Sequence, residues 1–479
     1  MDRRAPRRLV LVAGAGVSGL VAARALAARN DVVLAEADGA CGGKMRTAEF
    51  RGCPLDLGPD VFITRNPAAE RLCRELGLGD ELIAPSTARA AIWARGTLRP
   101  FPPGLALGIP IDLVALLRSG VVSPAAIARA ATDLVPRGRV TPAGFADATS
   151  PDVDLSVGTV VGRRLGREVV ETLVDPLLGG INAGDVRQLS FAATAPELAA
   201  AIAGRWSVLL ALRSYLRKGK KPQTRTSPIF LGLGRGLEAL ARRLEKDCGE
   251  RGVEIRTSTA VGSIRRNAAG RGWRVDLGQT ELACDGVVLA APSHVSAKIV
   301  AAEAPELAAL LATIPYAGVV TVSFAWPATV LADSTRSLVG SGVLVPRRDG
   351  LLATALSLTS SKWPRSARPD EIVVRASAGH HGDGRALALD DEALVGRLRS
   401  EIATILGIGA TPLDALVQRW PESFPQYVVG HRARVARIES LAADLGPIAL
   451  AGAWAHGIGI PACIVQAERA AAALGAALG

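Results

Sequence analysis

Three glycines near the N-terminus, Gly14, Gly16 and Gly19, have the spacing Gly-x-Gly-x-x-Gly, which suits phosphate binding. The first glycine permits a tight turn, the second lets backbone approach a pyrophosphate, and the third lets a helix pack closely on a strand. An apolar run from Leu9 precedes the glycines, and an Ala/Leu-rich segment to about Arg29 follows them. This order predicts a strand, a turn and a helix whose N-terminus presents free N–H groups to a dinucleotide.

An acidic residue follows where ribose recognition requires one. The apolar run Val32–Ala35 predicts a second strand, and it ends in Glu36, about 20 residues beyond the glycines. Two other interpretations are weaker. A secretory signal peptide would fit the arginines between positions 3 and 8, but it gives no reason for spaced glycines followed by a strand and an acid. A βαβ unit without a ligand gives no reason for the register of Glu36.

The next segment distinguishes FAD from NAD. The run Ala37–Lys44, with its doublet Gly42-Gly43, resembles the second glycine motif of the flavoprotein amine oxidase superfamily. That superfamily includes amine oxidases, phytoene desaturases and porphyrinogen oxidases. A second glycine pair enlarges the surface on which backbone can lie against FAD, and a fold that binds only NAD has no such requirement. The sequence therefore favours FAD.

Composition narrows the class of protein. A chain of 479 residues with 49% hydrophobic and 21% charged residues predicts two or three globular domains. The net charge of +11 favours acidic partners, namely nucleic acid, anionic lipid or a polycarboxylate substrate. Nucleic acid is the weakest of these because no aromatic platform is interleaved with the basic residues. Six cysteines without a C-x-x-C pair indicate free thiols, and no apolar run reaches the ~18 residues of a spanning helix, so we expect a cytoplasmic protein.

The middle of the chain alternates between helical and β-rich patterns. Residues 111–218 are typical of helices, with candidates at Ile111–Leu117, Pro124–Val135, Ser156–Leu178 and Ala199–Leu216. Lysines 218, 220 and 221 after the last candidate suit contact with an anionic membrane surface, although a core helix with a solvated charge run is favoured. Leu233–Ala291 returns to α/β patterning. The later runs predict an antiparallel sheet, with strands at Val319–Trp326, Leu338–Val345, Leu351–Leu358 and Glu371–Ala378.

The chain closes with a pattern suited to a flavin. A strand at Ile448–Ala451 is followed by a glycine-rich turn, by Pro461 as the expected first residue of a helix, and by an Ala-rich run to Leu478. A helix N-terminus aimed at the pyrimidine edge of a flavin would stabilise the negative charge of the reduced ring.

Several further segments resemble the bacterial protoporphyrinogen/coproporphyrinogen III oxidase family: Gly58–Phe62, Val174–Asp185, Ser377–Asp383, Trp420–His431 and Gly457–Ile464. The resemblance implies non-covalent FAD, a porphyrinogen substrate, O2 as electron acceptor with H2O2 as product, and transient contact with the next haem-pathway enzyme. Two departures from the family pattern are the small residues at 38–41 and Ala462 after Pro461, where an Asp is usual. Carried over by position, the implied FAD contacts are Gly14, Ala15, Gly16, Val17, Ser18, Gly19, Glu36, Ala37, Lys44, Gly58, Pro59, Asp60, Val61, Val261, Trp420, Ile458, Gly459 and Ile460.

The predicted fold is α/β (α+β overall) with three parts. Residues 1–90, 228–298 and 439–479 form an interrupted Rossmann-like FAD-binding domain, residues 91–110 and 299–438 an antiparallel-sheet substrate domain, and residues 111–227 a helical insertion.

The family resemblance implies hydride transfer from a porphyrinogen to flavin N5, and this needs no strong enzyme base. We therefore name no catalytic side chain. We also predict no metal site, because His380-His381 lacks a third ligand nearby and is expected to be solvated. Coproporphyrinogen III is the favoured substrate because its four propionates suit a basic chain. Arg65 is the candidate propionate ligand, with Asn182 beside Gly180 as the next.

Three other functions remain open. An amine oxidase or a carotenoid desaturase could be built on the same scaffold. A flavin-bearing assembly or sensor protein without turnover belongs to a different class.

Overall fold

Strands from three distant parts of the chain form one parallel sheet. The computed structural model describes residues 7–87, 89–136, 154–218, 228–268, 272–331 and 340–479. The five-stranded sheet has the order β12-β2-β1-β16-β22, and every neighbouring pair is parallel. This confirms the predicted α/β class with an interrupted Rossmann-like unit. The strands are β1 (Leu9–Ala13), β2 (Asp31–Ala35), β12 (Glu254–Arg256), β16 (Gly286–Leu289) and β22 (Ile448–Leu450).

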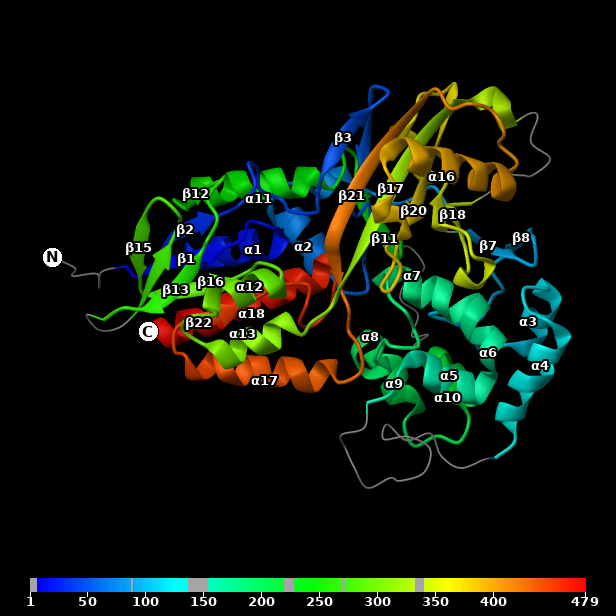
Figure 1. Ribbon diagram of the computed structural model, residues 1–479, viewed down its shortest axis with the longest axis horizontal. Coiled ribbons are helices and arrows are strands. Elements are labelled where there is room, and N and C mark those ends of the chain that lie inside the picture. The colour runs from blue at the N-terminus through cyan, green and yellow to red at the C-terminus, as the bar shows by residue number, and fades with distance from the viewer. Residues whose placement is uncertain (1–6, 88, 137–153, 219–227, 269–271, 332–339) are drawn as a thin grey trace.

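Two apolar layers cover this sheet, one on each face (Figure 1). Its strands are buried on both sides, which explains their near-continuous apolar sequence. On one face pack α1 (Val17–Leu26), α2 (Ala68–Glu75), α11 (Glu238–Glu250) and α18 (Ile460–Leu478). On the other pack α12 (Ser293–Val300), α13 (Pro305–Ala312), α17 (His431–Asp444) and the antiparallel strands β13 (Ser263–Arg266), β14 (Trp273–Asp276) and β15 (Glu281–Cys284).

A second sheet of seven strands has the order β21-β17-β20-β19-β18-β7-β8, and only the β18–β7 pair is parallel. One face is buried under α16 (Asp391–Leu406). On the opposite face Thr321, Ser377 and Ala355 are half-exposed and stand in register on three adjacent strands. The strands are β7 (Ala90–Ala94), β8 (Thr97–Pro100), β17 (Tyr316–Pro327), β18 (Gly342–Leu344), β19 (Ala353–Ser357), β20 (Glu371–Ala378) and β21 (Asp414–Pro425).

The predicted β-rich region is therefore a sheet, as expected. The first residues of the predicted strand Leu338–Val345 lie outside the described residues, and the observed strand β18 is shorter. Smaller strands connect the layers: β3 (Thr47–Phe50), β4 (Cys53–Asp56), β5 (Phe62–Ile63), β6 (Leu82–Ile83), β9 (Leu105–Ala106), β10 (Ile109–Pro110) and β11 (Phe230–Leu233).

The helical region differs from the sequence prediction in two places. The predicted helix Ala199–Leu216 is two helices, because Gly204 adopts a φ of +69° between them. The predicted helix Ser156–Leu178 is likewise interrupted at Gly166, with φ +93°, and continues as a π-helix. The region contains α3 (Leu113–Ser119), α4 (Pro124–Ala131), α5 (Val157–Leu165), α6 (Arg167–Val169), the π-helix η3 (Val170–Gly179), α7 (Gly180–Asn182), α8 (Phe191–Thr194), α9 (Pro196–Ile202) and α10 (Val208–Lys218).

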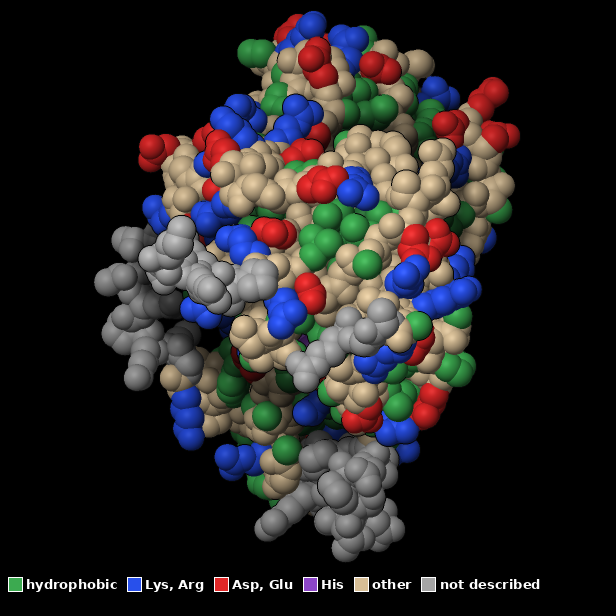
Figure 2. Space-filling view, turned by 90° about the vertical axis from the view of Figure 1, so that its left-hand side faces the viewer, with side chains coloured by type: hydrophobic (Ala, Val, Ile, Leu, Met, Phe, Trp, Pro, Cys, Tyr) green, Lys and Arg blue, Asp and Glu red, His purple; other side chains and the backbone are tan. Residues whose placement is uncertain are grey.

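The surface charge and the hydropathy of the helices bear on contact with a membrane. On the face drawn in Figure 2, Lys and Arg side chains are interspersed with Asp and Glu side chains. Within the described ranges, no helix combines the length and apolar character needed to cross a membrane. Of the lysine run after α10, Lys220 and Lys221 lie outside the described residues. The domain boundaries stay a prediction.

Candidate cofactor and substrate site

The Gly-x-Gly-x-x-Gly turn joins β1 to α1. Gly14 has a φ of +99°, and a Cβ there would lie 3.2 Å from the backbone of Ala290. A Cβ on Gly19 would lie 1.7 Å from the carbonyl oxygen of Gly14. A Cβ on Gly16, by contrast, would meet nothing within 4 Å. The outer two glycines are therefore required by the fold, whereas the middle glycine borders open space that a ligand can approach.

The N-terminus of α1 opens onto the same space. Gly16 is its N-cap residue, and no side chain in the described part of the chain caps Val17, Ser18 or Gly19. The first turn also carries no acidic residue that would satisfy the dipole. Free N–H groups and the positive end of the helix dipole make this terminus suited to a phosphate.

Glu36 directly follows β2 and turns its carboxylate toward the glycine turn. One carboxylate oxygen accepts from the Ala15 amide at 2.6 Å, and the other accepts from the Asp38 amide at 3.0 Å. The half-exposed carboxylate keeps further lone pairs for a ribose hydroxyl. The Thr259 amide donates to the Glu36 carbonyl at 2.7 Å, which brings Val261 to the same end of the site as Glu36 and Ala37.

The second glycine doublet packs directly on the first glycine motif. The Gly42 amide donates to the Ala15 carbonyl at 2.8 Å, and a Cβ on Gly43 would lie 3.3 Å from the Cα of Gly16. Lys44 keeps an exposed side chain although protein surrounds it closely enough for desolvation to lower its pKa. Its charge reaches Cys463 on α18. The doublet and the start of α18 therefore border, with Gly16, one region, the cofactor hollow.

The segment Asp56–Val61 runs along this hollow and is held by the second sheet. A Cβ on Gly58 would lie 2.1 Å from the Lys44 carbonyl oxygen, so only glycine fits. The carboxylate of Asp60 accepts from Lys362 Nζ at 2.6 Å and from Trp363 Nε1 at 3.0 Å. Burial raises its pKa, but the cations outweigh this effect and lower the pKa of Asp60 to about 2. The Asp60 side chain is thus already occupied, whereas Pro59 and Val61 beside it are half-exposed.

Two side chains of the second sheet hold the backbone of this segment. Trp420 Nε1 donates to the Leu57 carbonyl at 3.1 Å, and Arg375 Nη1 donates to the Asp56 carbonyl at 2.7 Å. Trp420 stands in β21 beside a bulge, where pairing with β17 shifts register between Ala317 and Val319. Bulges of this kind often re-aim side chains next to functional sites.

At the far end of the hollow, α18 begins after a glycine-rich loop. Gly459 is the N-cap and is exposed, Ile458 is half-buried and Ile460 is buried. Pro461 is the second residue of the helix rather than the first, which is a position where its missing N–H also costs little. No side chain among the described residues caps this terminus, so its first N–H groups are free, and they lie near those of α1 because Ser18 interacts with Cys463.

Comparison with known proteins decides the family. Residues 17–475 match the model described as flavin containing amine oxidoreductase. The chain belongs to this family. It is 30% identical over 474 residues to the coproporphyrinogen III oxidase of Bacillus subtilis, covering 97% of each chain. It is 33% identical over 470 residues to the enzyme of the same name from Mycobacterium tuberculosis, covering 97% of this chain and 96% of that one.

Solved structures agree with this assignment. A putative protoporphyrinogen oxidase from Exiguobacterium is 30% identical, covers 98% of this chain and 99% of that one, and gives a TM-score of 0.83. Reduced UDP-galactopyranose mutase gives a TM-score of 0.72 at 13% identity over 99% of this chain and 95% of that one, which indicates a shared fold alone. The resemblance to porphyrinogen oxidases is confirmed, and this flavin family supports a flavin as the cofactor of the hollow.

In this flavin oxidoreductase the substrate candidate Arg65 is a surface residue. Its side chain is 78% exposed, and Nη1 lies 3.2 Å from an oxygen of Glu197 on α9. The same Glu197 oxygen accepts from the Tyr215 hydroxyl at 2.6 Å. Arg65 thus joins the segment before α2 to the helical region through an exposed ion pair. Its role in substrate binding stays a prediction.

Asn182 and Gly180 lie on the turn that ends the π-helix. The Asn182 amide is buried and donates to the Leu178 carbonyl at 2.8 Å, so it serves the turn itself. Gly180 is exposed and a Cβ there would meet nothing within 4 Å, while Ile181 beside it is 48% exposed. The surface that this turn offers to a ligand is therefore Gly180 and Ile181 rather than the Asn182 side chain.

The paired histidines differ from the expectation of a solvated loop. The His380 side chain is only 15% exposed, and its Nδ1 lies 2.9 Å from the His381 carbonyl oxygen and 3.2 Å from Arg347 Nη1. Burial and the arginine charge both lower the pKa of His380. Arg347 also forms an ion pair with Asp175 on the π-helix at 2.9 Å. Over the described ranges, His, Cys, Asp and Glu side chains form no group of three that could hold a metal ion.

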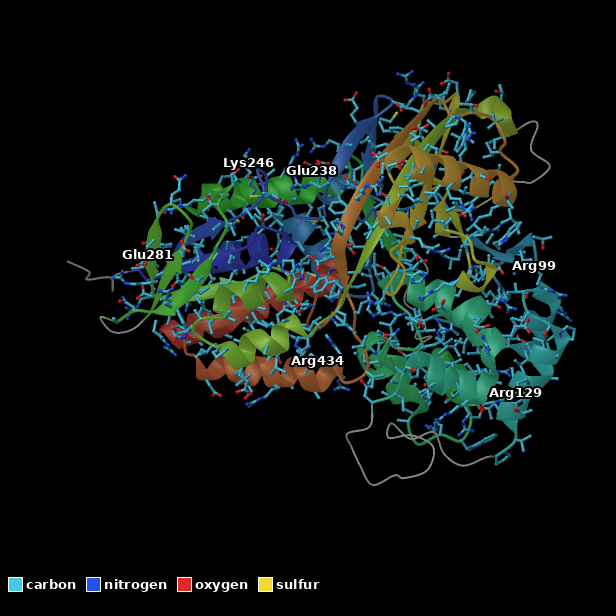
Figure 3. All side chains as sticks on the ribbon, in the orientation of Figure 1. Arg99, Arg129, Glu238, Lys246, Glu281 and Arg434 are labelled. Atoms are coloured by element: carbon cyan, nitrogen blue, oxygen red, sulfur yellow. The ribbon has the colours of Figure 1, made fainter. Side chains whose placement is uncertain are left out.

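Sequence reasoning missed the side chains that hold the hollow in place. Lys362 and Trp363 bind Asp60, and Arg375 binds the backbone near it. At the start of α11, the carboxylate of Glu238, labelled in Figure 3, accepts from the Thr47 amide at 2.7 Å. No local pattern identifies such pairs, because Asp60 and Lys362 are 302 residues apart.

Proposed function

We propose that this chain is a porphyrinogen oxidase that binds FAD without a covalent bond and takes hydride from the meso carbons of coproporphyrinogen III. The observation that carries the proposal is its similarity over nearly the full length to relatives named coproporphyrinogen III oxidase, at 29% to 34% identity. The cofactor hollow supports it independently, because its glycines and uncapped helix termini suit the phosphates of a dinucleotide.

Different residues of the hollow would bind different parts of the cofactor. The N-terminus of α1 and the backbone at Gly16 hold the pyrophosphate, and Glu36 holds the adenosine ribose. The N-terminus of α18 would lie at the flavin pyrimidine, where its dipole would favour negative charge on the ring. FAD, when bound, would supply the hydride acceptor at N5, with O2 as the final electron acceptor and H2O2 as its product.

The open face of the seven-stranded sheet is the part opposite α16 that carries Thr321, Ser377 and Ala355. We propose that a flat macrocycle binds on it. Thr321, Ser377 and Ala355 are small and half-exposed, and they stand in one row across β17, β20 and β19. Trp420, two residues along β21 from the partner of Thr321, connects this row to the segment at Leu57. A macrocycle on this row would lie beside the cofactor segment.

Charge favours the more acidic of two related substrates. Coproporphyrinogen III carries four propionates and protoporphyrinogen IX two, and the chain has a net charge of +11. Each additional carboxylate gains most where an arginine fork replaces water. We therefore expect the larger kcat/KM for coproporphyrinogen III at the same ionic strength.

The test is anaerobic reduction of the purified, flavin-loaded protein. Coproporphyrinogen III should bleach the flavin absorbance rapidly, protoporphyrinogen IX more slowly, and primary amines or a carotene precursor not at all. Re-admission of air should then restore the spectrum and release H2O2. Bleaching by an amine or carotene precursor alone would assign the alternative oxidase or desaturase activity, and bleaching by none would indicate an assembly or sensor protein. Flavin that stays on the denatured peptide would contradict non-covalent binding.

A further inference from the structure

The hydroxyl of Tyr427 spans the loop that leads into α18. It donates to the Ala453 carbonyl at 2.5 Å and accepts from the Gly457 amide at 2.7 Å. Both hydrogen-bonding functions of the hydroxyl are therefore used on one loop, whose two ends it ties together. Burial raises the pKa of Tyr427, so the hydroxyl keeps the proton that it donates.

Two more side chains hold the same loop. His431 Nε2 lies 3.1 Å from the Ala455 carbonyl oxygen, and its ring stacks on that of Tyr427 with 4.0 Å between centroids. Burial lowers the pKa of His431 to about 4, so it is neutral at ordinary pH. Gln466, on α18, accepts from the His456 amide at 3.1 Å and donates to the Gly457 carbonyl at 3.2 Å.

The segment that carries Tyr427 is itself fixed from the other side. The Ser190 amide of the helical region donates to the Tyr427 carbonyl at 2.7 Å, and the Val429 amide donates to the Gln188 carbonyl at 3.0 Å. Gln426 donates to the Asn182 carbonyl at 2.9 Å. Beyond this segment begins α17, the helix on which Figure 3 labels Arg434. Tyr427 is thus a rigid support for the loop rather than a mobile side chain.

We propose that Tyr427 is a positioning residue for the flavin, and that its hydroxyl sets the flavin reduction potential by fixing the backbone of residues 458–460. The inference rests on the proposed placement of the flavin pyrimidine at the N-terminus of α18. The effect of a helix terminus is confined to its first turn, and oriented N–H groups stabilise charge only where they are held in place. Without the hydroxyl, the Gly457 amide and Ala453 carbonyl lose their partner and the loop relaxes away from the ring.

The experiment compares Tyr427→Phe with Tyr316→Phe. Tyr316 is a matched control because its hydroxyl is also enclosed by protein and accepts one backbone amide, that of Ser293, at 2.9 Å. Both variants should lower the melting temperature of the flavin-loaded protein by similar amounts. Only Tyr427→Phe should lower the flavin reduction potential, measured anaerobically against a reference dye, and weaken flavin binding several-fold.

A second variant covers the case in which Tyr427→Phe does not fold. Gln466→Met removes another side chain that holds Gly457 and should lower the potential in the same direction while Tyr427 remains. Equal potentials in the wild type, Tyr427→Phe and Gln466→Met would overturn the proposal and leave Tyr427 a structural residue. Both quantities are measured without substrate, so a protein that shows these shifts but oxidises no porphyrinogen would contradict only the proposed function.

Discussion

Backbone atoms form the cofactor hollow, whereas side chains form the open face of the second sheet. Around Gly14–Gly19 the fold leaves no room for a Cβ at the outer glycines, and the ligand-facing groups are amides. Around Thr321 the strands carry small side chains whose backbone is already paired within the sheet. The first region therefore depends on positions where only glycine fits, while the second can change its ligand by changing side chains on an unaltered backbone.

Charged groups differ between the cofactor hollow and the exposed surface. Near the hollow, Asp60 is buried and bound to Lys362 and Trp363, so it supports the structure of its segment. Arg65 is exposed and paired across the surface with Glu197, where solvent weakens the interaction. Substitutions in the hollow should consequently affect flavin content first, and substitutions on the sheet face should affect substrate kinetics first.

The largest effect should come from the glycine turn. Gly19→Val places its Cβ 1.7 Å from the Gly14 carbonyl oxygen, so the strand and α1 cannot keep their packing and flavin binding should be lost. Gly16→Ala is the matched variant. Its Cβ meets nothing within 4 Å, so the fold should persist, but flavin binding should weaken because the methyl group occupies the space next to the pyrophosphate. Flavin-to-protein absorbance ratios after gel filtration measure both. Full flavin retention in Gly16→Ala would show that the pyrophosphate lies elsewhere.

The sheet face is tested by filling it. Ser377→Trp adds a bulky ring to the row of small residues, and we expect a rise in KM of about tenfold or more with normal flavin content, the pattern of lost substrate binding. Ser400→Trp, on the exposed side of α16, introduces the same side chain away from that row and should leave KM unchanged. Equal kinetics for both variants would remove the open face from the substrate site.

Glu36 tests the ribose end of the hollow. Glu36→Ala removes the carboxylate that holds the Ala15 and Asp38 amides and, in our proposal, the ribose. A hydrogen bond to a charged group contributes about 1.5–3 kcal/mol, so flavin should bind roughly 10- to 150-fold more weakly. Glu36→Gln should recover part of this loss. Isothermal titration of the flavin-free protein with FAD gives both constants, and unchanged affinity in Glu36→Ala would contradict the assignment.

Asp60 predicts a dependence of stability on pH. Its folded pKa of about 2 lies below the unfolded value, so its ionised form stabilises the native state above pH ~4, and this contribution is lost as the pH falls toward 2. At pH 7 the Asp60→Asn variant should lose about 2–3 kcal/mol, because the half-buried Lys362 is left without its partner. Denaturant unfolding should show this gap narrowing below pH 4. Asp31→Asn, in an exposed pair with Arg7, serves as the control and should change stability little.

The smallest expected effect concerns Arg65. If it holds a propionate, Arg65→Ala should raise KM and lower kcat/KM at normal flavin content, and Arg65→Lys should recover only part because an ammonium cannot reproduce the fork. Glu197→Ala sharpens the test, since it releases Arg65 from its ion pair and should then lower KM. Small and equal changes in all three variants would identify a surface pair without a substrate role.

The sequence by itself determined the features that depend on local geometry. The spacing of Gly14, Gly16 and Gly19 and the acid at Glu36 predicted the strand–turn–helix unit, because Gly14 and Gly19 stand where the backbone leaves little room for a Cβ and Gly16 borders open space. The alternation of Glu371–Ala378 likewise predicted a strand, which β20 matches at both ends. The sequence did not predict that two helices are interrupted, because Gly166 and Gly204 can either continue or end a helix according to the packing around them.

Only the tertiary structure decided which partners these elements meet. Asp60 finds Lys362 at a separation of 302 residues, and the Tyr427 hydroxyl finds the loop before α18. Buried polar groups must be paired, but periodicity gives only the face on which a residue stands and never the identity of the group opposite. The partner is selected when distant segments pack together. For that reason the supports of the cofactor hollow could be located in the fold and not in the sequence.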